Sequence, residues 1–294
     1  MQTRLIRYFL ALVKERHFAN AAEQCGVTQP TLSAGIHALE QQLGHRLIVR
    51  DRRFTGLTPA GEALLPWARQ LIAAQEGVKA AVAFASGPPS GEFRLGSIPA
   101  ALPFTGRLAH ALLQSRPALS LNVRSLSSRE ISRALANYEI DGGLTYLDHE
   151  PLPNVLSVPL YAEQYRILVH RDTPEAERGS LSLEEVVRLP LCLLHQGMQN
   201  RRILDSRFAE RGLELLPRVT ADSYVSLLSM VQSGSLATIV PDSYSAMLPD
   251  MPWVTVLGFK EDLASRQIGL VVLDRTPLTV LAETAIETAR SLVR

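Results

Sequence analysis

The residues best suited to recognition chemistry lie near the N-terminus, in the stretch VTQPTLSAGIH from Val27 to His37. A glutamine can form paired hydrogen bonds to adenine, and serine or threonine hydroxyls can reach bases or phosphates. In a helix-turn-helix, the second helix brings such residues into the major groove at its N-terminal end. The candidate DNA-contacting residues of this stretch are Thr28, Gln29, Pro30, Thr31, Ser33 and His37.

A helix, a tight turn and a second helix would position these side chains. We expect a first helix over residues 20–25, a left-handed turn at Gly26 and a second helix capped by Thr28. An upstream helix over residues 3–15 would close the core. The buried face of the second helix is predicted from apolar residues spaced 4, 3 and 4 apart, which are Leu32, Ile36, Leu39 and Leu43. A small helical core with a charged turn would give a similar pattern, so both interpretations remain open at this point.

Arginines alternate with apolar residues in the following segment, HRLIVRDRRFTGLT, at residues 45–58. This alternation predicts a β-hairpin wing whose Arg50, Arg52 and Arg53 reach phosphates or the minor groove. Residues 1–58 carry eight basic and four acidic side chains, a net charge of +4, whereas the whole chain carries only +1. A basic first fifth on a slightly acidic remainder is typical of a DNA-binding head on a separate body.

Residues 3–66 resemble the winged helix-turn-helix of the LysR-type transcriptional regulators. The similarity includes AAEQCGVTQPTLSAGIHALEQQLGHRL and the following LTPAGEALL, and it extends more loosely over the whole chain. The resemblance implies a DNA-binding domain over residues 1–58, with the stretch from Gln29 to Ser33 in its recognition helix. This family usually has arginine or another long polar residue after the serine, where this chain has Ala34 and Gly35. We expect these two missing side chains to remove base or phosphate contacts and to change the operator preference.

A long helix is predicted over residues 59–85, beginning after a Thr58 cap. Its apolar seam has the coiled-coil spacing and consists of Leu64, Ala68, Leu71, Gln75, Val78 and Val82. A helix packed only on its own domain is the alternative. The resemblance implies that the helix dimerises and that the protein is a homotetramer, a dimer of dimers. The sequence SGPPSG at residues 86–91 predicts a hinge.

Strand and helix patterns alternate after the hinge, which indicates an α/β domain over residues 92–294. The predicted strands include residues 93–97, 119–124, 142–146 and 165–170. The resemblance implies an effector domain like a periplasmic binding protein, with two lobes that the chain crosses twice. Lobe one would then comprise residues 92–161 plus 266–294, and lobe two residues 162–265.

Polar residues at the strand ends and helix starts of this domain are candidates for binding a small-molecule effector, because ligands of open α/β sheets bind there. Free amides at helix starts favour a small organic anion, and Arg201 and Arg202 could hold a carboxylate. Helix caps that bind nothing use the same residue types, so this alternative is kept. The candidates are Ser97, Pro99, Ala100, Ala101, Ser125, Ser127, Ser128, Thr145, Tyr146, His195, Gln196, Met198, Ser223 and Tyr224.

Several protein classes are disfavoured. The sequence contains no GxGxxG, GxxxxGK[ST], HExxH or GxSxG motif, so we expect neither an enzyme nor a cofactor. Cys25 and Cys192 belong to no metal or CxxC pattern, and we expect both to pack in the interior rather than to form a thiol switch. A charged N-terminus and the lack of a long apolar run predict a cytoplasmic protein with no membrane partner.

The sequence therefore predicts a sequence-specific transcriptional regulator that binds double-stranded promoter DNA and responds to a small-molecule effector. RNA polymerase is a candidate further partner. The alternative is a cytoplasmic small-molecule-binding protein or enzyme with an incidental helical head.

Overall fold

The computed structural model describes residues 2–50, 54–87, 91–248 and 251–293. The chain forms two compact units, residues 1–87 and residues 88–294. Each unit is described by itself. Of the helices in the described ranges, none combines the length and the apolar character that crossing a membrane requires.

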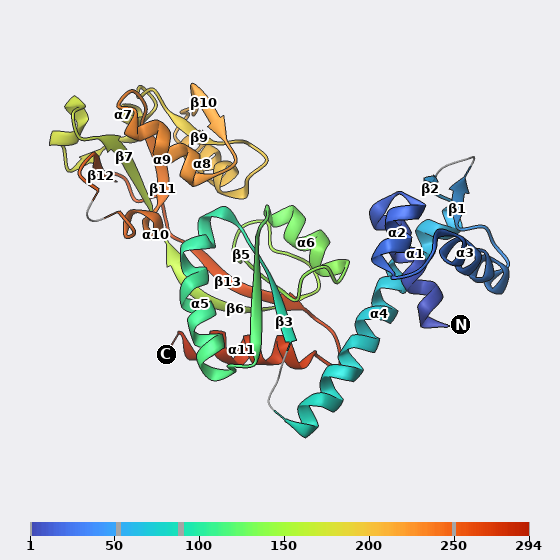
Figure 1. Ribbon diagram of the computed structural model, residues 1–294. Coiled ribbons are helices and arrows are strands. Elements are labelled where there is room, and N and C mark those ends of the chain that lie inside the picture. The colour runs from blue at the N-terminus through green and yellow to red at the C-terminus, as the bar shows by residue number, and fades with distance from the viewer. Residues whose placement is uncertain (1, 51–53, 88–90, 249–250, 294) are drawn as a thin grey trace. The chain divides into compact units, whose positions relative to one another are not determined.

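Three helices form the core of the first unit, as predicted (Figure 1). They are α1 (Thr3–Glu15), α2 (Phe18–Gln24) and α3 (Gln29–Leu43). Phe9, Leu32 and Ile36 are fully buried between them. Gly26 has the expected positive φ of 65°, and the Thr28 hydroxyl accepts from the Thr31 amide at 3.4 Å. The turn and the cap thus begin α3 where the sequence predicts.

A short antiparallel hairpin follows, formed by β1 (Ile48–Arg50) and β2 (Phe54–Leu57). Arg52 and Arg53 lie outside the described residues, and only the backbone of Arg50 is described. The base of the hairpin is joined to the next helix, α4 (Pro59–Ser86), through Thr58. The Thr58 hydroxyl donates to the Arg46 carbonyl at 2.6 Å and accepts from the Gly61 amide at 3.1 Å. The wing and α4 therefore share one set of hydrogen bonds.

The exposed stripe of α4 differs from the predicted seam. Ala68 is buried against the helical core of its own unit, and Leu64 packs there too. The large apolar side chains that remain exposed are Trp67, Leu71, Val78, Val82 and Phe84. The predicted seam follows one face of α4, but its first residues pack on the core of the head, whereas Leu71, Val78 and Val82 further along the helix are exposed.

Lobe one of the second unit contains a five-stranded sheet in the order β4-β3-β5-β13-β6. Strand β3 pairs in parallel with β4 and β5, whereas β13 pairs antiparallel with β5 and β6. Helices α5 and α11 pack together on the sheet, and α6 contacts β5 and β13. The bounds are β3 (Gly91–Ser97), η1 (Pro99–Ala101), α5 (Leu102–Ser115), β4 (Leu119–Ser125), α6 (Ser128–Ala136), β5 (Gly142–Tyr146), β6 (Val155–Glu163), β13 (Arg266–Leu273) and α11 (Val280–Ser291).

Lobe two has a four-stranded sheet, β11-β7-β12-β8, and a parallel pair, β10-β9. A bridge between Leu191 and Ala237 joins the two. Both of its larger helices, α8 and α9, lie against β9. The bounds are β7 (Tyr165–His170), η2 (Pro174–Glu177), β8 (Ser180–Leu181), α7 (Leu183–Val186), β9 (Cys192–Leu194), α8 (Gln199–Ala209), β10 (Val219–Ala221), α9 (Tyr224–Gln232), β11 (Thr238–Pro241), α10 (Asp242–Ser245) and β12 (Val254–Phe259).

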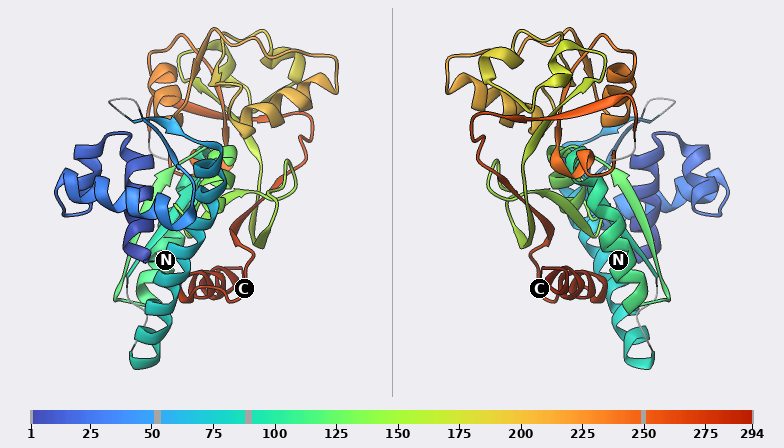
Figure 2. Two further views of the ribbon diagram at one scale, coloured as in Figure 1. Left: turned by 90° about the vertical axis from the view of Figure 1, so that its right-hand side faces the viewer. Right: turned by 90° about the vertical axis from the view of Figure 1, so that its left-hand side faces the viewer.

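The chain passes between the lobes twice, from β6 to β7 and from β12 to β13, which confirms the two-lobe fold. Figure 2 shows lobe two, in yellow and orange, apart from the green and red elements of lobe one. Strand β6 ends at Glu163, so the chain leaves this sheet two residues later than the predicted boundary at residue 161. At the first crossing, the end of β6 in lobe one is followed directly by the start of β7 in lobe two.

Candidate functional site

The N-terminal half of α3 presents a polar surface. Thr28, Gln29, Pro30, Thr31 and His37 are exposed and Ser33 is half-buried, whereas the apolar face of the helix is buried. The hydroxyls of Thr28 and Thr31 lie 2.8 Å apart, so the cap also orders this surface. An exposed, rigid start of a helix is the part that enters the major groove in this class of fold. The structure therefore brings the predicted DNA-contacting residues of α3 onto one face.

Gly35 does not belong to this surface, and the expectation for its missing side chain is wrong. The residue is buried, and a Cβ at this position would lie 2.5 Å from Cδ2 of Tyr8 in α1. Glycine is thus required for the close approach of α1 and α3, and no side chain at residue 35 could point to DNA. Ala34 is exposed, so the expected change in DNA contacts concerns this residue alone.

A carboxylate fixes the other end of α3 to the wing. Glu40 is 5% exposed, and its Oε1 accepts from the Leu47 amide at 3.0 Å. Nδ1 of His37 lies 3.7 Å from the same carboxylate. The recognition surface and the first wing residues are therefore held by one buried acceptor.

The second unit has a cavity of about 10 Å³ between its lobes, room for about one water molecule. Five of the predicted effector residues line it, namely Pro99, Ala100, Ser127, Ser128 and Met198. Ile98, Leu194, Gln199 and Asn200 complete the lining, and the sequence prediction did not include them. The two lobes are thus in contact here, and a larger ligand requires them to separate.

The other predicted effector residues do not line this cavity. Ser125, His195 and Gln196 are exposed, and Ser223 caps α9 by accepting from the Val225 amide at 3.2 Å. Ala101 is buried in the core beside the cavity lining. Ser97 and Thr145 are fully buried within lobe one. The Ser97 hydroxyl donates to the Ile98 carbonyl at 3.1 Å, and the Thr145 hydroxyl lies 3.5 Å from Gln199 Oε1.

The start of α6 beside the cavity is already capped by the chain itself. The amide and hydroxyl of Ser127 both donate to Glu130 at 2.8 Å, and these hydrogen bonds lower the pKa of Glu130. Arg202 is held by Glu150, and Gln199 donates to the His149 carbonyl. These last two contacts join α8 of lobe two to the loop after β5 of lobe one.

Arg201 is a structural residue rather than a ligand-binding one. Its side chain is 3% exposed and donates to Asp205 at 2.7 Å and to the carbonyls of Leu194 and Leu215 at 3.2 and 3.1 Å. We expect Arg201→Met to lower the free energy of unfolding by about 3 kcal/mol, because the buried acceptors lose a charged donor. Urea unfolding measures the change. The exposed Arg211 is the control, since Arg211→Met should stay within about 0.5 kcal/mol; equal losses in both variants would contradict the assignment.

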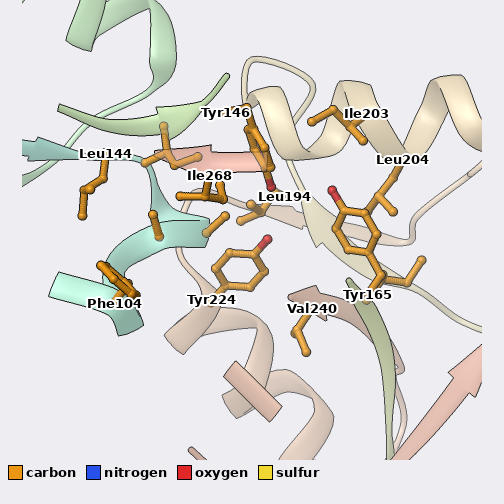
Figure 3. Close-up of a cluster of buried hydrophobic side chains, with 14 of the residues drawn as sticks. Phe104, Leu144, Tyr146, Tyr165, Leu194, Ile203, Leu204, Tyr224, Val240 and Ile268 are labelled. Atoms are coloured by element: carbon orange, nitrogen blue, oxygen red, sulfur yellow. The ribbon is translucent and has the colours of Figure 1, made fainter. Parts of the chain in front are cut away.

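A polar cluster, which we call the Glu163 cluster, lies beside the first crossing, and all of its members except the half-buried Tyr161 and Tyr244 are buried. It consists of Tyr146, Tyr161, Glu163, Tyr165, Asn200, Tyr224 and Tyr244. Asn200 donates to Tyr146 at 2.9 Å and to Tyr165 at 3.4 Å, and Tyr146 donates to Oε1 of Glu163. Figure 3 shows the hydroxyls of Tyr146, Tyr165 and Tyr224 directed toward one another. Tyr146 and Tyr224 were predicted as effector residues, but the sequence prediction did not include the carboxylate.

Burial shifts the ionisation of this cluster and of the cysteines. It raises the pKa of Glu163 well above the usual range of a carboxyl and raises the pKa of Tyr146 and Tyr224. It also raises the pKa of Cys192 to about 11 and raises that of Cys25. Of the described residues, no three histidine, cysteine, aspartate or glutamate side chains are grouped so that they could hold a metal ion.

A helix-turn-helix head with an exposed polar recognition helix, joined to a two-lobed α/β body with an interlobe cavity, defines a DNA-binding regulator with an effector domain. The chain belongs to the LysR family of such regulators. Residues 3–62 match the family described as bacterial regulatory helix-turn-helix protein, lysR family, and residues 86–294 match the LysR substrate binding domain. These matches support the regulator and not the alternative of a binding protein or enzyme with an incidental head.

Individual proteins are similar over nearly the whole chain. The chain is 30% identical over 268 residues to the probable hydrogen peroxide-inducible genes activator of Mycobacterium avium, covering 90% of this chain and 86% of that protein. A full-length OxyR variant from Pseudomonas aeruginosa has a TM-score of 0.78 and 24% identity, covering 99% of this chain and 95% of that one. Full-length CbnR complexed with its target DNA has a TM-score of 0.72 and 22% identity, covering 99% and 100%. Both structures share the fold.

Proposed function

We propose that this regulator reads its promoter through the N-terminal half of α3 and responds to an effector bound between the two lobes. The exposed surface formed by Thr28, Gln29 and Thr31 carries the proposal, because these side chains are free to meet base edges and phosphates. We place the DNA-binding domain at residues 1–58, the linker helix at 59–85 and the effector domain at 92–294. Because its target is promoter DNA, we infer that the protein acts in the cytoplasm, by binding rather than by catalysis.

Promoter preference tests this function. The purified protein should bind its own upstream region about a thousandfold or more tightly than a scrambled duplex of equal length and composition, at moderate ionic strength. Affinity for both duplexes should fall as salt rises, since phosphate contacts release counterions. Equal affinity for the two duplexes would refute base reading by α3.

Self-association follows from the exposed stripe of α4. Trp67, Val78 and Val82 are 69%, 64% and 65% exposed, which is unusual for large apolar side chains unless a second surface covers them. We propose that two α4 helices pair along this stripe, so that two heads read a two-fold operator, and that two such dimers form a tetramer. Sedimentation of the full chain tests this assembly, and a monomer would refute it.

Control by the effector requires that it prefer one arrangement of the lobes. A ligand shifts such an equilibrium only by the ratio of its affinities for the two states. Among the contacts that hold the lobes in the present arrangement, Tyr244 donates to the Pro99 carbonyl at 2.7 Å, and Arg202 holds Glu150. An effector that separates the lobes breaks these contacts. The resulting change in lobe arrangement is how we propose that ligand binding alters the assembly and its DNA-binding domains.

Several relatives are named for hydrogen peroxide, yet we propose that this protein does not sense peroxide through a thiol. The thiolate is the reactive form of cysteine, and burial raises the pKa of both cysteines. Promoter affinity should therefore be unchanged after peroxide treatment, both in the wild type and in a Cys25→Ser, Cys192→Ser double variant. Electrophoretic mobility shift with and without peroxide measures this. A peroxide effect that disappears in the double variant would establish thiol sensing.

A further inference from the structure

The Glu163 cluster contains three oxygen atoms that the protein leaves without hydrogen bonds. Oε2 of Glu163 and the hydroxyls of Tyr161 and Tyr224 are buried, and no partner for them lies among the described residues. Glu163 itself is 0% exposed and Tyr224 is 2% exposed. Each buried oxygen left in this state costs about as much as a lost hydrogen bond. Three such oxygens in one cluster are acceptors that a small donor group would satisfy once the lobes separate.

Both lobes and the first crossing supply the groups around these oxygens. Tyr146 comes from the end of β5 in lobe one, Tyr161 and Glu163 from β6, Tyr165 from the start of β7, and Tyr224 from α9. A ligand here would therefore contact lobe one, lobe two and the strand that joins them. Aromatic rings flank the place: Tyr161 stacks on Phe104 with centroids 5.0 Å apart, and the Tyr224 and Tyr244 centroids are 4.4 Å apart.

The charged groups near the cluster are mostly acidic. Asp242 lies near enough to Glu163 to disfavour its ionisation. On the Tyr165 side lie Arg266 and Asp148, whose side chains are 3.9 Å from each other. A further buried anion would add negative charge here. A cation would instead allow Glu163 to ionise and would form a neutral pair with it, which is the arrangement that buried charges require.

We propose that the Glu163 cluster, when the lobes separate, binds the ammonium group of a small amine, with Glu163 as its counter-ion. An ammonium has three donors, and the three unsatisfied oxygens are one carboxyl oxygen and two phenol oxygens. Because burial raises the pKa of Glu163, we expect ammonium binding to favour the ionised carboxylate and to release a proton to solvent.

This inference rests on the proposed effector site but is tested without DNA. The probe is methylammonium chloride at about 100 mM, with sodium chloride and sodium acetate as matched salts, and the readout is the melting temperature of the full chain. We expect methylammonium to raise it by on the order of 2 °C over sodium chloride. If binding releases a proton, the affinity for methylammonium should rise with pH, by up to about tenfold per pH unit, until the free carboxyl of Glu163 ionises.

Glu163→Gln is the decisive variant, because it keeps the shape of the side chain and the hydrogen bond from Tyr146 but cannot ionise. It should abolish the melting shift and the pH dependence, and calorimetry in two buffers should show proton release fall from near one to zero. Tyr224→Phe should weaken binding while keeping proton release. Glu177→Gln, at an exposed glutamate, should behave like the wild type.

Two results would overturn the proposal. The first is that methylammonium does not raise the melting temperature of the wild type at any pH measured, or that it raises the melting temperature of Glu163→Gln equally. The second is stabilisation by acetate that requires Glu163 to keep its proton, which would assign the place to an anion. Neither result touches promoter selectivity, so the proposed function would fail only in the duplex comparison.

Discussion

Replacing Gln29 with alanine weakens binding to the best operator by about 1–3 kcal/mol and leaves binding to random duplex nearly unchanged. Gln29 is exposed in the first turn of α3, directly after the Thr28 cap that fixes this turn. We propose that its amide reads one base, so that its loss should remove hydrogen bonds to that base only. Competition binding with operator and scrambled duplex measures both affinities in one experiment.

The matched control is Gln42→Ala, which removes the same side chain from the last turn of the same helix. Gln42 is also exposed, but it lies at the end of α3 that does not enter the groove. Operator affinity should stay within about 0.5 kcal/mol of the wild type. Parallel losses on operator and random DNA for Gln29→Ala would mean that Gln29 contacts phosphate rather than a base.

Two glycine-to-alanine substitutions should change stability in opposite directions. In a helix interior, alanine is favoured over glycine by about 1 kcal/mol. At Gly106 in α5, no atom lies within 4 Å of an added Cβ, so the substitution stabilises lobe one. At Gly35 the added Cβ meets Tyr8, whose ring is 5% exposed and cannot move aside, so overpacking destabilises the head by about 1–3 kcal/mol. Amide hydrogen exchange in α1–α3 and in lobe one reports the two effects separately.

A second-site change separates steric crowding from any other role of Gly35. Tyr8→Leu shortens the side chain that the new Cβ meets, so Gly35→Ala in that background should become neutral or stabilising. Persistent destabilisation in the double variant would show that Gly35 is needed for a reason other than contact with Tyr8. Operator affinity of the single variant should fall only as far as the folded fraction of the head does.

Local signals predicted many elements because those signals act within a few residues. The helix over Thr3–Glu15 and the strands Gly142–Tyr146 and Tyr165–His170 occur at the predicted bounds. Strand β6 was not predicted. It contains Pro159, which favours a strand at the edge of a sheet, and β6 is an edge strand. Strand β12 was also missed, although its sequence VTVLGF is an ordinary strand pattern.

The site was harder to predict because it depends on contacts between distant elements. Glu163 precedes an exposed glutamine, and from sequence it looks like a solvated strand end, but residues from both lobes bury it. From the sequence, Arg201 would be expected to be a solvated cation at a helix start. In the structure it is buried, because it donates hydrogen bonds to the Leu194 and Leu215 carbonyls. The role of Gly35 had a local signal: it lies three residues after Leu32 and four before Leu39, in the buried stripe.

The junction at Thr58 has a mechanical consequence. Its side chain and backbone bind the carbonyls of Arg46 and Leu47, and a Cβ on Gly61 would lie 2.1 Å from the Leu47 oxygen. The base of the wing is thus rigidly joined to the first turn of α4, and the hairpin cannot move independently of this helix. We therefore expect any rotation of α4 about its own axis to turn Arg46 and the hairpin through the same angle. The orientation of the wing would then follow the movement of this helix.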